Sequence, residues 1–285
     1  MTGAIDRVIS YPAGRAVFQA VRPFVHLARR IANPGVSTDH MIARVAYRDR
    51  KFAIQHRRWS RDDVLAIKQS FEDYQYDLPR GAHGVLIENI YQEIVAAGKQ
   101  PLIVDCGANI GTSVAWFSAR YPKAHITAIE PAPSNFALLR HNTAGLDVDL
   151  HQAGIAAEDG RAYLRMTGGE MGYKTNTEQK GIEIDLVSLK TLMATKPESD
   201  YTPFILKIDI EGAEETLFSG DTTLFNRFPL IVIELHDWLF PGQLSSQGFF
   251  RFHAAAGREF CMNKENVASI IPHSSLLKIT GGFEN

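Results

Sequence analysis

The sequence is poor in cysteine and has no long apolar run. Only two cysteines, Cys106 and Cys261, occur among its 285 residues. Two thiols alone form neither a disulfide framework nor a four-ligand zinc site. No apolar stretch approaches the roughly 18 residues that cross a bilayer. These absences argue against a disulfide-stapled or membrane-spanning protein, and they favour a reducing, intracellular compartment.

An export signal and an excess of basic charge are also missing. Asp6 stands where a signal peptide would be basic, and Pro12 interrupts what would be its apolar stretch. The net charge is −2, so nothing in the overall charge points to a nucleic-acid partner. Hydrophobic residues make up 45% of the chain and charged residues 22%, which is typical of a globular protein. We therefore expect a cytoplasmic protein that does not bind nucleic acid.

Positive charge is concentrated in the N-terminal part of the chain. Residues 1–51 carry nine basic and three acidic side chains, although the whole chain is slightly acidic. Apolar residues recur there at helical spacing over residues 17–31, and Asn33-Pro34-Gly35 ends the pattern. We interpret this stripe as packing on the protein's own core. The alternative is a helix that contacts an anionic glycolipid or the inner membrane surface.

A second helical pattern covers residues 62–67 and has acids in its first turn, as the helix dipole prefers. Breaker residues then fill positions 78–84. We therefore divide the chain into an N-terminal helical extension, residues 1–80, and a larger domain, residues 81–285. The extension is expected to serve the acceptor side, docking or a homo-oligomer contact.

Beyond residue 84, strand-like and helix-like runs alternate. The strand-like runs are residues 102–105, 126–130, 148–153, 204–209 and 230–234, and the helix-like runs are residues 111–120, 134–142 and 213–218. Such alternation predicts βαβ units, and therefore an α/β fold with a doubly wound, mostly parallel sheet. Residues 259–262 and 267–271 flank a turn-like segment and are expected to form an antiparallel hairpin at the sheet edge.

The most informative motif joins a buried strand to a helix through a glycine turn, and it reads Asp105-Cys106-Gly107-Ala108-Asn109-Ile110-Gly111. Ligands of open α/β sheets bind at the carboxyl ends of the strands, where this turn would lie. Its G-x-x-x-G spacing lacks the G-x-G-x-x-G of dinucleotide sites, and Asp105 suits a ligand with positive charge and hydroxyls. The structural alternative is a tight turn with a buried aspartate that caps the helix.

Glu130 ends the next strand-like run, about 20 residues past the glycine turn. An acid at that place can accept hydrogen bonds from both hydroxyls of a ribose, so any nucleoside cofactor could use it. An exposed acid at the end of a strand is common, but the pairing with the glycine turn favours the cofactor interpretation.

Acids also gather after two later strands. Asp209 and Glu211 follow a strand that contains Lys207, and Glu234 and His236 lie two residues apart on one strand face. Burying so many charges for stability alone is unfavourable, so we expect a functional role. His236 is a candidate general base, or a structural histidine. Asp209, Glu234 and His236 could also bind one divalent cation, Mg²⁺ or Mn²⁺.

Four segments in combination resemble the FkbM-type methyltransferases, a class I family that depends on S-adenosylmethionine (SAM). They are DCGANIG, the strand-end EP followed by PSNFALLRHN, AGIAAEDG and LKIDIEGAE. The resemblance covers roughly residues 86–262. It implies a Rossmann-like methyltransferase sheet of seven strands with an antiparallel last strand. The family is associated with O-methylation, often of sugar hydroxyls in glycans and glycosylated metabolites.

The resemblance also implies roles for individual residues. Asp105, Gly107, Asn109 and Gly111 would surround the methionine part of the cofactor, and Glu130 would hold the ribose hydroxyls. Gly154 and Ile155 would lie beside the adenine. Asp209 and Glu211 would face the methyl group and the acceptor.

A sugar hydroxyl is a weak nucleophile, so a base must take its proton as it attacks. Asp209, Glu211 and His236 are the candidates. The sequence thus predicts an O-methyltransferase that acts on a sugar, glycan or glycosylated metabolite. Two alternatives are a Rossmann oxidoreductase with a nicotinamide cofactor and a non-catalytic cofactor-binding module.

Overall fold

The computed structural model describes residues 39–78, 81–166, 173–176, 181–211, 213–239 and 241–272. The amphipathic stripe of residues 17–31 lies outside these residues, so its packing and its proposed membrane or glycolipid contact stay predictions. Within the described ranges, no helix has both the length and the apolar character that a membrane crossing requires.

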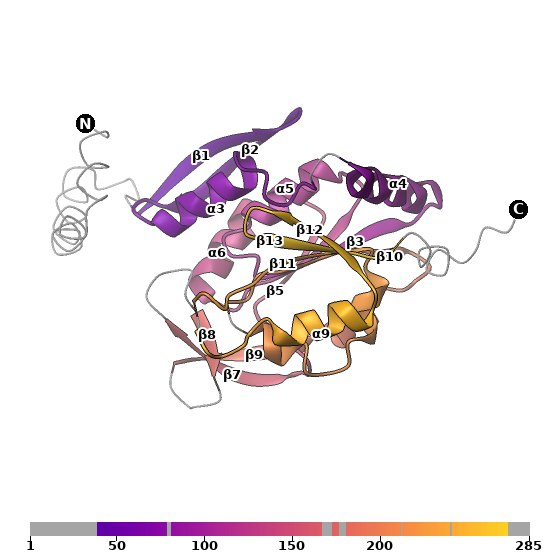
Figure 1. The fold of residues 1–285 in the computed structure, drawn as a ribbon. Helices are drawn as coiled ribbons and strands as arrows, with labels where there is room; N and C mark the ends of the chain where they lie inside the picture. Colours follow the sequence, from indigo (N-terminus) through magenta and orange to yellow (C-terminus); the bar gives the residue numbers. More distant parts are fainter. Residues whose placement is uncertain are drawn as a thin grey trace, which may run out of the picture.

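The predicted sheet is present and has seven strands in the order β12-β13-β11-β10-β3-β4-β5 (Figure 1). The strands are β3 (Gln100–Cys106), β4 (His125–Ile129), β5 (Val148–His151), β10 (Tyr201–Ile208), β11 (Leu230–Glu234), β12 (Glu259–Asn263) and β13 (Asn266–Ile270). Pairing is parallel from β11 through β10, β3 and β4 to β5, whereas β13 runs antiparallel to both of its neighbours. The order, the direction and the edge hairpin confirm the predicted Rossmann-like methyltransferase architecture.

Helices cover both faces of this sheet. They are α4 (Ala82–Ala96), α5 (Thr112–Arg120), α6 (Pro133–Asn142), α7 (Leu189–Ala194), α8 (Glu214–Leu217), α9 (Gln247–Ala255) and the 3-10 helix η1 (Thr223–Arg227). Successive residues of β3 face opposite sides, because side chains alternate along a strand. Ile103 packs in one core with α4, α5 and α6, whereas Leu102 and Val104 pack in a second core with α7, α8 and α9.

A smaller sheet of order β6-β9-β7-β8 was not anticipated from the sequence. Its strands are β6 (Gly154–Ala156), β7 (Gly160–Met166), β8 (Tyr173–Asn176) and β9 (Ile182–Ser188). The predicted strand over residues 148–153 therefore ends early, at His151, and the chain passes into the second sheet at Gly154. The pattern misses this change of sheet because β6 pairs with β9, which lies far along the chain.

The extension is only partly helical where it is described. The expected helix of residues 62–67 is present as α3 (Arg61–Phe71), capped by the Ser60 side chain, which accepts a hydrogen bond from the backbone N–H of Asp63. Residues 40–57 instead form an antiparallel hairpin, β1 (His40–Tyr47) and β2 (Arg50–Arg57). Half-buried and exposed side chains alternate along β1, which is the pattern of a strand with one covered face.

The hairpin and α3 share the core of the main sheet. Ile54 of β2 and Phe71 of α3 belong to the same buried cluster as Trp116 of α5. The ring of Tyr47 lies 5.2 Å from that of Trp116, measured between centroids. In Figure 1 the hairpin and α3 lie beside α5, on one side of the sheet. The described part of the extension is therefore packed as part of the main body.

We predict that Ile54→Ala lowers the free energy of unfolding by about 2–5 kcal/mol, because it opens a cavity in a close-packed core. Ile54 is fully buried, whereas Ile42 on the partner strand is 48% exposed. Ile42→Ala is the matched control and should change stability by no more than about 0.5 kcal/mol. Urea unfolding followed by circular dichroism measures both. Equal effects of the two substitutions would show that the hairpin does not share the core.

Candidate active site

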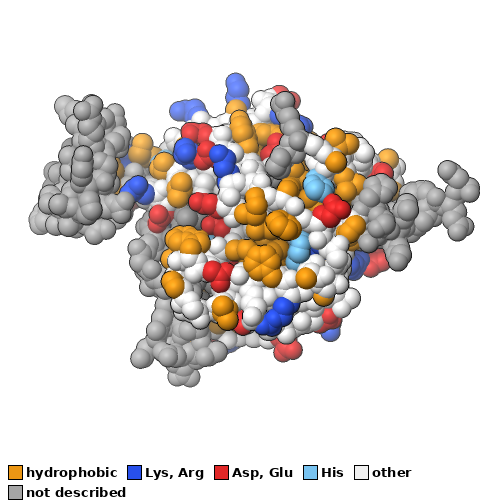
Figure 2. Space-filling model, viewed as in Figure 1, with side chains coloured by type: hydrophobic (Ala, Val, Ile, Leu, Met, Phe, Trp, Pro, Cys, Tyr) orange, Lys and Arg blue, Asp and Glu red, His pale blue; other side chains and the backbone are white. Residues whose placement is uncertain are grey.

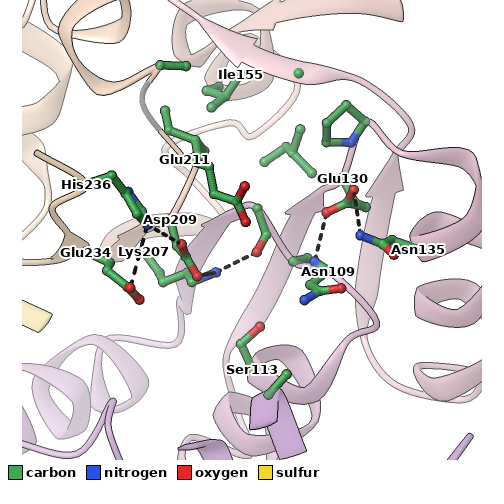
Figure 3. A pocket seen from close by; sticks show the side chains of 18 of the residues that line it. Asn109, Ser113, Glu130, Asn135, Ile155, Lys207, Asp209, Glu211, Glu234 and His236 are labelled. Carbon is green, nitrogen blue, oxygen red and sulfur yellow. Dashed lines mark hydrogen bonds and ion pairs between the residues drawn. The ribbon is translucent and has the colours of Figure 1, made fainter. Parts of the chain in front are cut away.

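The predicted site residues come together at the carboxyl ends of β3, β4, β10 and β11. A cavity of about 340 Å³ lies there. Nine of the predicted residues line it: Gly107, Asn109, Glu130, Gly154, Ile155, Asp209, Glu211, Glu234 and His236. Figure 3 shows Glu130 with Asn109 on one side and Asp209 with His236 on the other. Asp105 and Gly111 are not in the cavity wall and lie behind it.

The turn after β3 requires glycine at Gly107. Its φ of +83° is in the left-handed region, and a Cβ built there would lie 1.8 Å from the backbone oxygen of Asp209. The chain after β10 therefore approaches the turn more closely than any side chain allows. This contact places Asp209 beside the glycine turn.

A buried lysine connects the same two strand ends. Lys207 Nζ donates a hydrogen bond to the carbonyl oxygen of Gly107 at 2.6 Å, and it lies 3.1 Å from Asp105 Oδ1 and 3.5 Å from Asp209 Oδ2. Burial alone would lower the pKa of Lys207, but Asp105 and Asp209 outweigh it and hold the pKa well above its ordinary value. The ammonium group is therefore a permanent charge of the site.

Asp105 makes buried contacts next to the cavity. It is fully buried, and besides Lys207 it binds Ser113, whose Oγ donates to Asp105 Oδ2 at 2.6 Å. The buried position agrees with the structural alternative named for this turn, a buried aspartate beside the start of the helix, whereas direct contact of Asp105 with a cofactor stays a prediction. Its contacts tie the first turn of α5 to Lys207, so any effect of Asp105 on a cofactor acts through the glycine turn.

Glu130 is buried and held by the backbone around it. Its Oε2 accepts a hydrogen bond from the N–H of Asn109 at 3.0 Å, and its Oε1 accepts one from the N–H of Ala132 at 2.8 Å. Asn135 approaches Oε1 at 3.4 Å. Burial raises the pKa of Glu130 to about 7, although these hydrogen bonds act in the opposite direction. The carboxylate is thus fixed in place at the edge of the cavity.

Two features on this side of the cavity fit a nucleoside ligand. Among the residues that the structure describes, the buried side-chain oxygen of Asn109 has no hydrogen-bond partner. Ile155 of β6 and Leu164 of β7 supply an apolar wall nearby. Leu164 was missed by the sequence analysis because β7 itself was not recognised. An unpaired polar atom, a fixed carboxylate and an apolar wall are the groups that a ribose and an adenine require.

The opposite side of the cavity is built around His236. Its Nδ1 lies 2.6 Å from Oε1 of the fully buried Glu214, and its Nε2 lies 3.6 Å from both Asp209 Oδ1 and Glu234 Oε1. Burial would lower the pKa of His236, but the hydrogen bond with Glu214 and the nearby carboxylates raise it to about 9. The imidazole is consequently protonated at neutral pH. Repulsion from Asp209 adds to burial and raises the pKa of Glu234 to about 7.

Glu214 was not selected from the sequence, although it belongs to the acidic run that drew attention to Asp209. It lies in the first turn of α8, and its carboxylate contacts His236, which follows the end of β11. Glu211, by contrast, was predicted. It lines the cavity between the two groups of residues and has a left-handed backbone, with φ of 49°.

A divalent cation is compatible with the same cluster. Asp209, Glu234 and His236 each place one potential ligand atom within 4.8 Å of the others. Because Glu214 holds Nδ1, the Nε2 atom of His236 faces the two carboxylates, which is the usual arrangement of a metal-binding imidazole. Two carboxylates and one imidazole suit Mn²⁺ better than Mg²⁺, which prefers oxygen ligands.

Comparison with known proteins agrees with this geometry. The family profile of the methyltransferase FkbM domain matches residues 105–256, which is more than half of the chain. Methyltransferase 1 of Beauveria bassiana is 28% identical over 181 residues, covering 54% of this chain and 71% of that protein. Methyltransferase sdnD of Sordaria araneosa is 28% identical over 163 residues, covering 45% of this chain and 63% of that protein.

Solved structures give only partial similarity. A putative caffeoyl-CoA O-methyltransferase from Staphylococcus aureus has 13% identity and a TM-score of 0.37, covering 73% of this chain and 92% of that one. The amino pentose methyltransferase CalS10 from Micromonospora echinaspora has 29% identity over 25% of this chain and 29% of its own, with a TM-score of 0.17. The nicotinamide-dependent alternative is set aside, because the family match, the sheet order and the glycine turn agree: the chain belongs to the FkbM family of SAM-dependent methyltransferases.

Proposed function

We propose that this methyltransferase transfers the methyl group of SAM to a hydroxyl oxygen of a sugar, a glycan or a glycosylated metabolite. The observation that carries the proposal is the ionisable cluster of Asp209, Glu234 and His236 on the side of the cavity opposite Glu130. An alcohol needs its proton removed as it attacks, and this cluster supplies groups that can hold one. The family's association with sugar hydroxyls suggests the acceptor class.

The cofactor is expected to bind along the Glu130 side. Each carboxylate oxygen has two acceptor positions. Oε2 holds the N–H of Asn109 and has a second position for a ribose hydroxyl, and Oε1 holds the N–H of Ala132 and would accept the other hydroxyl in place of the long Asn135 contact. Ile155 and Leu164 would contact the adenine, and Asn109 Oδ1 would accept a hydrogen bond from the ligand. SAM supplies the methyl group on a positively charged sulfur. The acids at Asp209 and Glu211 favour that charge, and they would orient the acceptor toward it.

Proton transfer is assigned to Asp209, with His236 as its charged partner. At neutral pH the imidazole of His236 already carries a proton, because Glu214 and the nearby carboxylates stabilise its cation. The carboxylates are then the groups able to accept the hydroxyl proton, and the backbone of Asp209 lies against the glycine turn at Gly107. Glu211 faces the same space and is the second candidate. In the metal-dependent version, Asp209, Glu234 and His236 would hold an ion that acidifies the hydroxyl.

Glu130→Ala should weaken binding of S-adenosylhomocysteine, the demethylated product, by about 1.5–3 kcal/mol, or ~10- to ~100-fold, because hydrogen bonds to a charged group are lost. Isothermal titration calorimetry measures the affinity. Glu183→Ala on β9 is the matched control, since the Glu183 side chain is 52% exposed and lies outside the cavity wall. An unchanged dissociation constant for Glu130→Ala would contradict the ribose role.

Asp209→Asn should lower turnover by about 100-fold or more and leave the affinity for S-adenosylhomocysteine nearly unchanged, because a neutral amide cannot take the acceptor proton. Transfer of isotope-labelled methyl groups from SAM into a panel of methyl glycosides measures turnover. Full activity of the variant would rule out both proposed roles of Asp209. Treatment of the wild type with a chelator, followed by Mn²⁺ or Mg²⁺, separates the two roles, since only a metal-dependent reaction is lost and restored.

Glu214→Gln should lower the pKa of His236 from about 9 toward its ordinary value of 6.5, because the carboxylate that stabilises the cation is replaced by an amide. NMR titration of the imidazole measures the shift. A raised folded-state pKa contributes stability that is complete below pH 6.5 and is lost as pH rises through about 9. The variant should therefore lose less stability than the wild type between pH 7 and pH 10. A titration curve that does not move would show that Glu214 does not control His236.

A further inference from the structure

Part of the cavity wall comes from residues outside the range 105–256 that the family profile matches. Asp62, Ala66 and Gln69 of α3 all line the cavity. Their spacing of i, i+4 and i+7 places them on one face of the helix. Gln69 is held by the turn between β12 and β13, because its Nε2 donates to Glu265 Oε2 at 3.0 Å. The extension thus presents a carboxylate, a small residue and an oriented amide to the cavity.

A second part of the cavity wall follows shortly after His236 in the chain. Trp238 and Leu239 line the cavity, and they are 71% and 39% exposed. An indole ring this exposed leaves much of its apolar surface in water, which is unfavourable for folding, and a smaller polar residue would avoid this cost. Tyr76 also lines the cavity; it is buried, and its ring centroid lies 6.0 Å from Lys207 Nζ. The lining of the cavity that contains the ionisable cluster therefore combines an exposed apolar surface with polar side chains.

These two walls fit a ring that is apolar on one face and bears hydroxyl groups along its edge. An indole provides a broad, rigid apolar platform for the C–H face of such a ring. Carboxylate and amide groups accept and donate hydrogen bonds to its hydroxyls. Ala66 occupies the middle of the α3 face, so its small side chain sets the room that remains for the ring.

We propose that Trp238 and the α3 face formed by Asp62, Ala66 and Gln69 are the acceptor subsite, in which a sugar ring stacks on Trp238 and is oriented by α3. This inference rests on the proposed function, since it names the subsite that holds the hydroxyl acceptor. It assigns acceptor selectivity to the extension and to the segment after β11, and it leaves cofactor binding to the residues around Glu130.

Substitutions at two positions, Trp238 and Ala66, test the subsite. Trp238→Ala removes the stacking surface and should raise the KM for methyl hexopyranosides about 3- to 10-fold, whereas Trp238→Phe should restore most of the loss. Ala66→Leu fills the space of the ring and should raise the same KM. Neither should change the affinity for S-adenosylhomocysteine by more than about twofold, and this affinity also reports correct folding.

The chain offers a matched control for each variant. Phe250→Ala removes a ring of α9 that is 50% exposed and outside the cavity wall. Figure 2 shows that exposed hydrophobic side chains gather near the centre of the face in view. Ala53→Leu enlarges an exposed alanine on β2. Both controls should leave the KM unchanged. Fluorescence gives a second readout, because sugar binding should alter the emission of the wild type but not that of Trp238→Phe.

The possible results distinguish failure of the subsite from failure of the proposed function. If the wild type methylates pyranosides and the KM rises only in Trp238→Ala and Ala66→Leu, the subsite is supported. If the wild type methylates pyranosides but both variants keep its KM and Trp238→Phe keeps its fluorescence response, the subsite is wrong and the proposed function stands. If catechol, used as a flat aromatic acceptor, is methylated and no pyranoside is, the sugar acceptor itself is wrong.

Discussion

The structure depends on one buried cation at the point where two strands end. Lys207 holds the carbonyl oxygen of Gly107 and lies between the carboxylates of Asp105 and Asp209. A buried ammonium without such partners would be strongly unfavourable, so the strand ends are held in the register that satisfies it. The missing Cβ at Gly107 lets the backbone of Asp209 approach, and Lys207 then joins the glycine turn to Asp209. One constraint thereby positions both halves of the site.

A second buried pair sets the charge of the acceptor side. Glu214 is fully buried and its partner is His236, whose other nitrogen faces Asp209 and Glu234. The protonated imidazole offsets part of the negative charge that these acids would otherwise concentrate in a confined space. That balance leaves the cluster able to accept a proton, or to exchange the imidazole proton for a metal ion.

The sequence was sufficient for the parts of the site that depend on local pattern. A strand followed by a glycine turn predicted the position of Gly107, and the strand-end acid predicted Glu130, because parallel strands bring their carboxyl ends to one edge. Pairings between distant segments were not visible in it. Glu214 meets His236 only after the chain has folded, and Leu164 reaches the cavity wall only because β7 pairs with β9. The predicted helical extension of residues 1–80 does not include the hairpin of residues 40–57, whose period-two pattern is obscured by exposed apolar side chains such as Ile42.

The extension packs into the main core, and polar contacts also connect it to Glu130 at the edge of the cavity. Arg57 of β2 pairs with the fully buried Asp63 of α3 at 2.5 Å and donates to Asn135 Oδ1 at 3.0 Å. Asn135 in turn approaches Glu130 Oε1 at 3.4 Å. A continuous set of polar contacts therefore runs from α3 to the carboxylate of Glu130. The partners of a buried ion pair cannot separate without a large cost, so Arg57 and Asp63 hold β2 and α3 together, and Asn135 connects this pair to Glu130. Under the proposed function, the helix that would orient the acceptor and the carboxylate that would hold the ribose belong to one connected network, which suits the alignment that in-line methyl transfer requires.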